Sequence, residues 1–256
     1  MGSITNVNSK SLLAKLFSGE NITVEHDYKV EIPIFNTKTR VLKLPMWDGN
    51  IVTDEMYDTF VAHECAKALY SPSDSSYLND ICHTIDSENP NHVMEWLNII
   101  EGFRIDEKMI SKYPGLRPIN YKGYKDFNNL DGFGINSIPD HNLNKLSFID
   151  RIYLYDKIGK YGFRNIPFSD EEKRIFDDIK NARSFPEIAD IVKKYYQHKD
   201  KDPNDASSDG SGNESGNNEG NNQGQGNNQG QGNNQGQGNN QGQGIVTGKQ
   251  IGRAHV

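Results

Sequence analysis

The alternation of apolar and polar residues predicts a small sheet near the start of the chain. A short amphipathic helix is predicted over 9–17, and strands are predicted over 22–26, 32–35 and 40–44. Asn36-Thr37-Lys38 separates the last two strands and predicts a β-hairpin, and Pro45 ends its second strand. We therefore expect a small antiparallel sheet.

The spacing of apolar residues becomes helical after residue 53. Thr53 is a suitable N-cap, and Asp54 and Glu55 follow it in the first turn, where the helix dipole favours negative charge. Helices are predicted over 54–70, 90–112, 142–159, 169–182 and 186–197. A small sheet followed by helices is typical of the α+β class.

The composition changes abruptly near residue 199. Residues 221–244 are four copies of Asn-Asn-Gln-Gly-Gln-Gly, which offer no apolar surface to offset the entropy of ordering. The sequence thus predicts a folded domain over 1–198 and a disordered Asn/Gln/Gly-rich linker over 199–250. Residues 251–256 match one reading frame of a standard sequencing adapter, so we expect an adapter-derived end that takes no part in function.

The charge and the cysteine content indicate which partners and which cellular compartment to expect. The chain has 28 basic and 35 acidic residues and a formal net charge of -7, which argues against nucleic acid or an anionic membrane as the partner. Two cysteines, Cys65 and Cys82, are too few for a disulfide framework and favour a reducing compartment. With no membrane-spanning run and no signal peptide in the sequence, a cytoplasmic location is expected.

One predicted helix carries a pattern that resembles a zinc site. It contains His63-Glu64-Cys65-Ala66-Lys67. In a His-Glu-x-x-His helix, two imidazoles on one face bind zinc, and the glutamate activates the zinc-bound water as general base. The sequence therefore predicts His63 as a metal ligand and Glu64 as the catalytic residue, with the second histidine position lost at Lys67.

The next long helix offers a third ligand. Glu101 is a carboxylate in an apolar stretch, and Asn98 and Ile105 lie on the same helical face, which predicts an inward-facing polar stripe. The alternative is a solvent-exposed glutamate on a charged helix. Cys82 and His83 are predicted to lie in the connection between the two helices, from which they could supply a replacement ligand.

Several short motifs resemble one known family. They are His63-Glu64, Asn98-x-x-Glu101, Arg104-Ile105-Asp106, Tyr113-Pro114-Gly115-Leu116 and Phe148-Ile149-Asp150-Arg151-Ile152. Over residues 5–198 the chain is similar to a tailed-phage family of zincin-like metallopeptidases, which are related to the T subunit of cobalt chelatase.

This resemblance implies a mostly helical zincin-like domain and a C-terminal von Willebrand-type A domain beyond the linker. It also implies a MoxR-type AAA+ ATPase as partner and the cytoplasm of an infected bacterium as location. The resemblance also implies that Asn98 and Arg104 belong to the site. The chain departs from the family at Lys67, where the second histidine is expected, and at Gly102, where an aspartate is expected.

A lysine ammonium cannot bind zinc unless it loses its proton, and its ordinary pKa is about 10.4. We therefore expect Lys67 to pair with Glu64 or Glu101 and to replace the ion structurally. The main hypothesis is a catalytically silent module that binds a peptide or protein. One alternative is an active zinc peptidase that uses His63, Glu101 and a further ligand. A third is a structural phage protein without a substrate.

Overall fold

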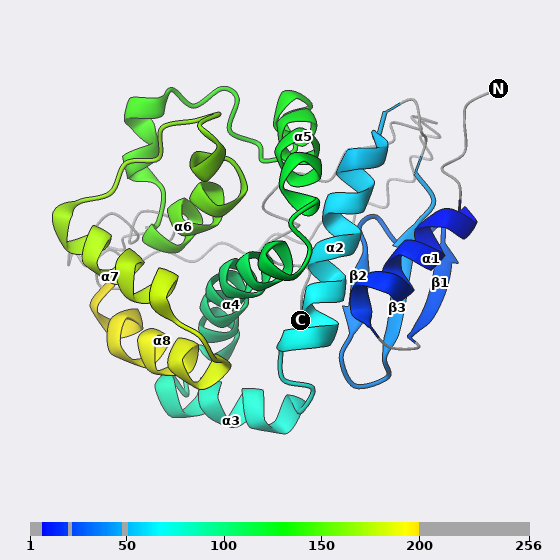
Figure 1. Ribbon diagram of the computed structural model, residues 1–256. Helices are drawn as coiled ribbons and strands as arrows, with labels where there is room; N and C mark the ends of the chain where they lie inside the picture. The colour runs from blue at the N-terminus through cyan, green and yellow to red at the C-terminus, as the bar shows by residue number, and fades with distance from the viewer. Residues whose placement is uncertain (1–6, 20–21, 48–50, 200–256) are drawn as a thin grey trace, which may run out of the picture.

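The computed structural model describes residues 7–19, 22–47 and 51–199 (Figure 1). The strands are β1 (Thr23–Asp27), β2 (Ile34–Asn36) and β3 (Val41–Pro45). The helices are α1 (Val7–Ser18), α2 (Asp54–Tyr70), α3 (Ser75–Ile85), α4 (Pro90–Lys112), α5 (Leu116–Asn129), η1 (Asp140–Lys145), α6 (Phe148–Lys157), η2 (Gly159–Tyr161), α7 (Asp170–Asn181) and α8 (Phe185–Lys199). These elements confirm the α+β class. The predicted linker from residue 200 and the adapter-like residues 251–256 lie outside the described residues.

The sheet is mixed, so the prediction of a purely antiparallel sheet is wrong. The predicted hairpin is present: β2 and β3 are antiparallel, with Phe35 opposite Leu42. However, the strand order is β1-β3-β2, and β1 runs parallel to β3, with Thr23 opposite Val41. The chain reverses between β1 and β2 and again between β2 and β3. Because β1 pairs with the strand after its sequence neighbour, the two reversals leave the paired strands parallel.

Most predicted helices are present, with three differences. α2 begins after Thr53, whose hydroxyl accepts a hydrogen bond from the Met56 N–H (3.2 Å), as the cap pattern predicts. The helix predicted over 142–159 is divided, because Ser147 caps a new helix and accepts from the Asp150 N–H. Two helices, α3 and α5, were not predicted. Cys82 and His83 therefore lie inside α3 and not in a connection, so that expectation is wrong.

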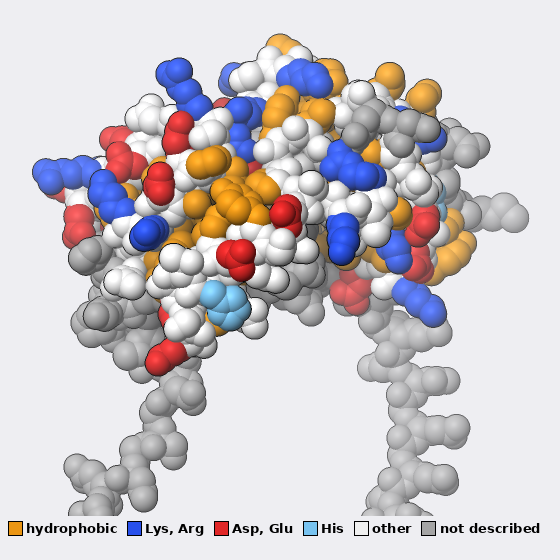
Figure 2. All heavy atoms as spheres, turned by 90° about the horizontal axis from the view of Figure 1, so that it is seen from below, with side chains coloured by type: hydrophobic (Ala, Val, Ile, Leu, Met, Phe, Trp, Pro, Cys, Tyr) orange, Lys and Arg blue, Asp and Glu red, His pale blue; other side chains and the backbone are white. Residues whose placement is uncertain are grey.

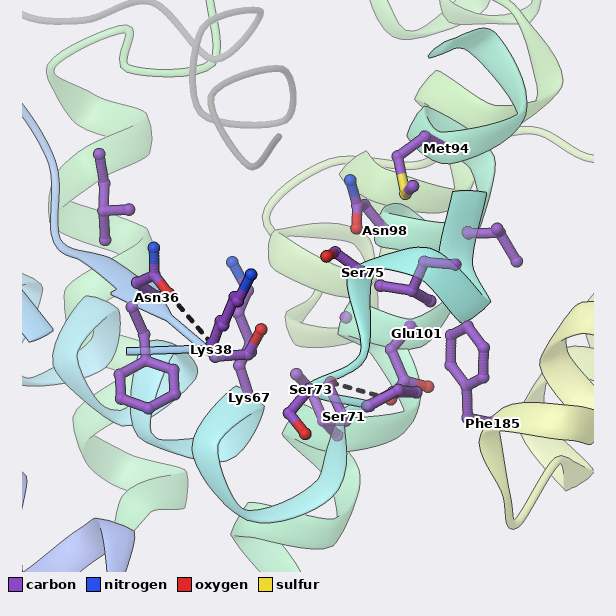
Figure 3. Close-up of a pocket in the computed structure, with 18 of the residues that line it drawn as sticks. Asn36, Lys38, Lys67, Ser71, Ser73, Ser75, Met94, Asn98, Glu101 and Phe185 are labelled. Carbon is purple, nitrogen blue, oxygen red and sulfur yellow. Dashed lines mark hydrogen bonds between the residues drawn. The ribbon is translucent and has the colours of Figure 1, made fainter. Parts of the chain in front are cut away.

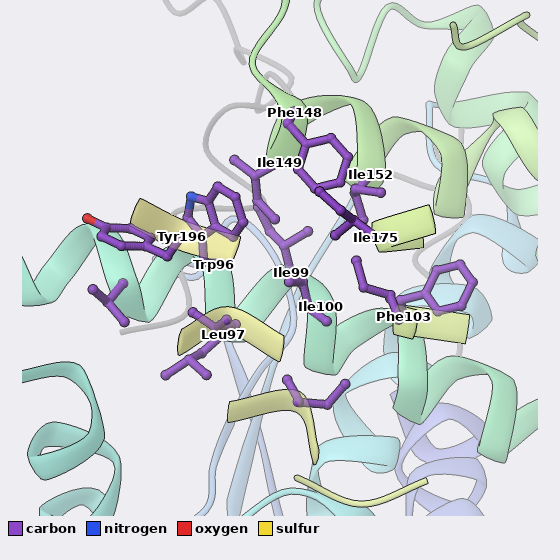
Figure 4. Packing of buried hydrophobic residues seen from close by; sticks show 14 of the residues in the cluster. Trp96, Leu97, Ile99, Ile100, Phe103, Phe148, Ile149, Ile152, Ile175 and Tyr196 are labelled. Atoms are coloured by element: carbon purple, nitrogen blue, oxygen red, sulfur yellow. The ribbon is translucent and has the colours of Figure 1, made fainter. Parts of the chain in front are cut away.

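Helix α4 passes through the centre of the molecule (Figure 1) and contributes to two of its apolar clusters. Its N-terminal half packs Trp96, Leu97 and Ile100 against α3, α6, α7 and α8. Figure 4 shows this cluster around the α4 side chains, with Phe148 and Ile175 from α6 and α7. Burial on all sides explains why the α4 sequence lacks a strongly polar face.

A second apolar cluster joins the sheet to the helices through α2. Leu42 and Leu44 of β3 pack with Val61 and Cys65 of α2 and with Ile105 of α4. Helix α2 also contacts α1, α5 and β2. Because α2 is enclosed in this way, its side chains take fixed directions, and the His63–Lys67 stretch faces α4 and the edge of the sheet.

Close packing of α2 on α5 depends on Gly123, which lies where the two helices meet. A Cβ at residue 123 would overlap the Thr59 hydroxyl and lie 2.6 Å from the Glu55 carbonyl oxygen. Gly123→Ala is therefore expected to lower the free energy of unfolding by about 1–3 kcal/mol, although alanine is intrinsically the better helix former by about 1 kcal/mol. Urea titration followed by circular dichroism measures the change.

Gly115→Ala is the matched control. A Cβ at residue 115 meets no atom within 4 Å, and the backbone there has an ordinary φ of -61°. Its effect should stay within about 0.5 kcal/mol. Equal stability of the two variants would contradict a close α2–α5 contact at Gly123.

Candidate functional site

The residues singled out by sequence lie on two helices that pack together. His63, Glu64 and Lys67 are on α2, and Asn98, Glu101 and Arg104 are on α4. Lys67, Asn98 and Glu101 line one pocket, together with Ile105, as the spacing along α4 predicts. His63 and Glu64 are not among the lining residues. The structure thus brings the two helices together, but only some of the predicted site residues face the pocket. The others make contacts inside the protein.

Both carboxylate oxygens of Glu64 are engaged. Glu64 is only 2% exposed. Its Oε2 accepts a hydrogen bond from the Phe35 backbone N–H (2.8 Å), and its Oε1 accepts one from the Lys67 ammonium (2.9 Å). The side chain therefore ties α2 to the edge strand β2. A general base has to reach the proton that it removes, whereas this carboxylate is enclosed by two donors.

Lys67 makes the ion pair that the sequence predicts, and its partner is Glu64. The side chain is 17% exposed, and its Nζ lies 2.9 Å from Glu64 Oε1. Burial lowers the pKa of Lys67 below its ordinary value, while the charge of Glu64 acts in the opposite direction. Glu64 is itself almost fully buried. The attraction between the two side chains therefore offsets much of the cost of removing their charges from water.

His63 pairs with a residue that the sequence did not assign. Its Nδ1 lies 2.7 Å from Asp106 Oδ1. The imidazole also lies against Gly102, where a Cβ would be 3.4 Å from His63 Cε1. A carboxylate bonded to one ring nitrogen orients an imidazole, as in many metal sites. Here the same carboxylate also pairs with Lys157, whose Nζ lies 2.6 Å from Oδ2.

Asp106 and Lys157 begin a buried chain of alternating charges. Lys157 also pairs with Asp156 (2.7 Å), and Asp156 pairs with Lys160 (2.8 Å). Burial alone raises the pKa of Asp106, but His63 and Lys157 outweigh it and hold that pKa well below the usual range. Burial lowers the pKa of Lys157, but Asp106 and Asp156 raise it well above its ordinary value. Asp106 and Lys157 are therefore both charged near neutral pH.

Glu101 is buried, so the alternative of a solvent-exposed glutamate is wrong. It is 5% exposed, and its carboxylate receives two bonds from Arg104, at 2.5 Å to Nη2 and 2.7 Å to Nε. The Ser71 hydroxyl donates a third bond (3.0 Å). Arg104 also donates to the backbone carbonyls of Tyr70 and Arg183. The pair therefore joins α4 to the end of α2 and to the α7–α8 connection.

The donor groups in this arrangement do not fit zinc. A protein zinc site needs three or four nitrogen, sulfur or oxygen ligands directed at one point. Here Glu64 and Glu101 are each held by a cation, and His63 faces Asp106. Within residues 7–19, 22–47 and 51–199, no group of three or more His, Cys, Asp or Glu side chains is arranged to hold a metal ion. Cys82 is buried in the apolar cluster around α4 and supplies no replacement ligand.

The pocket beside these pairs has a volume of about 480 Å³. Figure 3 shows Lys38 and Lys67 on one side of it and Met94, Asn98 and Glu101 on the other. The other walls are formed by the α2–α3 connection, by α3 and by Phe185. Figure 2 views the molecule from the side of α3 and shows a patch of hydrophobic side chains with basic side chains across from it.

The chain matches no protein-family model, no curated protein and no solved structure. In the part that the structure describes, no helix is long and apolar enough to cross a membrane. The resemblance to phage metallopeptidases therefore stays a prediction from the sequence motifs.

Proposed function

We propose that this protein is a catalytically silent, metallopeptidase-like binding or assembly module. The observation that carries the proposal is the ion pair of Lys67 and Glu64, at 2.9 Å, on the helix that carries the His-Glu pattern. An ammonium in this position supplies the positive charge that a metal ion would bring. It also occupies the carboxylate that a peptidase would need as base.

The neighbouring contacts support a binding role. His63 is held by Asp106 and Glu101 by Arg104, so each group of the expected metal site contributes to joining elements of the fold. Buried ion pairs of this kind hold their neighbours in fixed positions. The result is a rigid pocket wall next to a space of about 480 Å³, which is within the usual size range of small-ligand sites.

The partners are proposed from the sequence resemblance. A phage protein of this kind would act in the cytoplasm of an infected bacterium, beside a MoxR-type AAA+ ATPase, and would bind a peptide or protein. The pocket beside Lys67 is the surface on which we place that contact.

Zinc content tests the proposal. Purified full-length protein and the Lys67→His variant are equilibrated with excess zinc, freed of unbound metal by gel filtration, and analysed for elemental zinc. The unmodified protein is expected to retain none, because its carboxylates stay paired. The variant presents a second imidazole four residues from His63 and is expected to retain close to one equivalent, with Glu101 exchanging Arg104 for the metal as third ligand.

Lys67→Met is the matched control, because it removes the ammonium without adding a ligand, and it should retain no zinc. Near-equimolar zinc in the unmodified protein would instead favour an active peptidase with an unrecognised ligand. A folded Lys67→His variant without zinc would contradict the zincin-like arrangement.

A further inference from the structure

The wall of the pocket carries an excess of positive charge. Lys38 and Lys67 line it on one side, and Glu101 lines it on the other. Behind the wall, Glu64 pairs with Lys67 and Arg104 pairs with Glu101. These groups are three cations and two carboxylates, which leaves one net positive charge. That charge can be assigned to Lys38, because the other four groups form two pairs.

Lys38 is held in position by its turn. It lies between β2 and β3, where the Asn36 side-chain oxygen accepts hydrogen bonds from the backbone N–H groups of Lys38 (3.0 Å) and Thr39 (2.8 Å). Among the described residues, no carboxylate lies within ion-pair distance of its ammonium. Asp74 feels the charge of Lys38, but Asp74 caps α3 and is bonded to Ser76 and Tyr77. The Lys38 ammonium is therefore available to a ligand.

Apart from Asn98 and the paired Glu101, the side of the pocket opposite the two lysines is apolar. Leu78 of α3, Met94 and Leu97 of α4, and Phe185 at the start of α8 all line it. Figure 3 shows Met94 and Phe185 on this side, across the space from Lys38 and Lys67. Asn98 also lines the pocket, on the side of Met94. A ligand that fits has one carboxylate and, beside it, an apolar group.

We propose that this pocket binds the C-terminal end of a partner polypeptide. The terminal carboxylate is placed at Lys38 and Lys67, and the last side chain, an apolar one, is placed against Met94 and Leu97. A chain end brings one negative charge and one adjacent side chain, which matches the single excess charge and the apolar wall. This inference rests on the proposed function as a binding module and names the feature that the module recognises.

Affinity selection of peptides tests the inference. Immobilised full-length protein is offered two libraries of decapeptides with random sequences, one with free C-terminal carboxylates and one with C-terminal amides. Retained peptides are identified by mass spectrometry. Free acids that end in an apolar residue are expected to be enriched about tenfold or more over the matching amides, because hydrogen bonds to charged groups contribute this much.

Lys38→Gln should remove most of that enrichment, since it deletes the unpaired ammonium from an exposed turn and leaves the Lys67–Glu64 pair intact. Lys29→Gln, in an exposed turn outside the pocket, is the matched control and should leave the enrichment unchanged.

Equal retention of acids and amides would overturn the inference while leaving a binding module in place. Retention of neither library would also overturn it, and the zinc measurement would then decide separately whether the metal site has been replaced. Enrichment of free acids that Lys38→Gln leaves unchanged would place the site elsewhere and would overturn the assignment to this pocket.

Discussion

Replacing Asp106 with asparagine is expected to lower the free energy of unfolding by about 3 kcal/mol, at the lower end of the range for breaking a buried ion pair. Asp106 contacts His63 at 2.7 Å and Lys157 at 2.6 Å, and all three side chains are largely buried. Asparagine keeps the shape but removes the negative charge, so Lys157 loses one of its two carboxylates. Asp156 remains beside Lys157, which limits the cost. Urea titration measures the change.

Glu107→Gln is the control for that variant. Glu107 is the next residue on α4 and pairs with Lys160 at 2.9 Å, but its side chain is 46% exposed. Exposed pairs contribute about 0–1 kcal/mol, so the expected loss is small. If Asp106→Asn were no more destabilising than Glu107→Gln, the prediction that the buried ion pairs stabilise the fold more than an exposed pair would be wrong.

Arg104→Met is expected to cost about 3–5 kcal/mol, since it leaves a buried carboxylate without its cation. Methionine fills much of the same space. The loss of stability is therefore due mainly to the missing charge and hydrogen bonds. Arg104 makes two bonds to Glu101 and one each to the Tyr70 and Arg183 carbonyls. The variant should therefore also loosen the α7–α8 connection, which hydrogen exchange of the backbone amides near Arg183 would detect.

A second substitution separates charge from packing. Glu101→Gln added to Arg104→Met removes the unpaired carboxylate, and the double variant is expected to be more stable than Arg104→Met alone. If the double variant were less stable by the sum of the two single losses, the two residues would act independently, contrary to the geometry.

The sequence predicts contacts between residues of the same helix. It does not predict contacts between residues on different helices, which depend on how the helices pack. The Lys67–Glu64 pair follows from a spacing of three residues on α2, and the inward direction of Glu101 follows from its apolar neighbours. The Asp106–Lys157 pair joins residues that are 51 positions apart, on α4 and α6. Nothing in the local pattern of either segment indicates that they meet.

The two unpredicted helices show the same limit. α3 had a detectable signal, because Asp74 is an N-cap and Leu78, Cys82 and Ile85 recur at helical spacing. α5 contains Pro118, Gly123 and several asparagines, which disfavour a helix. It is stabilised by packing on α2, and its glycine serves that close contact. Tertiary contacts therefore override local propensity in α5.

The central strand of the sheet is the last one in the sequence, and this affects how the protein forms during synthesis. β1 has to wait for β3, since its partner residues, such as Thr23 and Val41, are 18 positions apart. β2 also pairs with β3, so neither earlier strand has a partner in the sheet until residues 41–45 have emerged from the ribosome. Glu64, which bonds the Phe35 N–H, arrives later still. We therefore expect a nascent chain that stops before Leu42 to be sensitive to proteases throughout, and protection of β1, β2 and β3 to arise together.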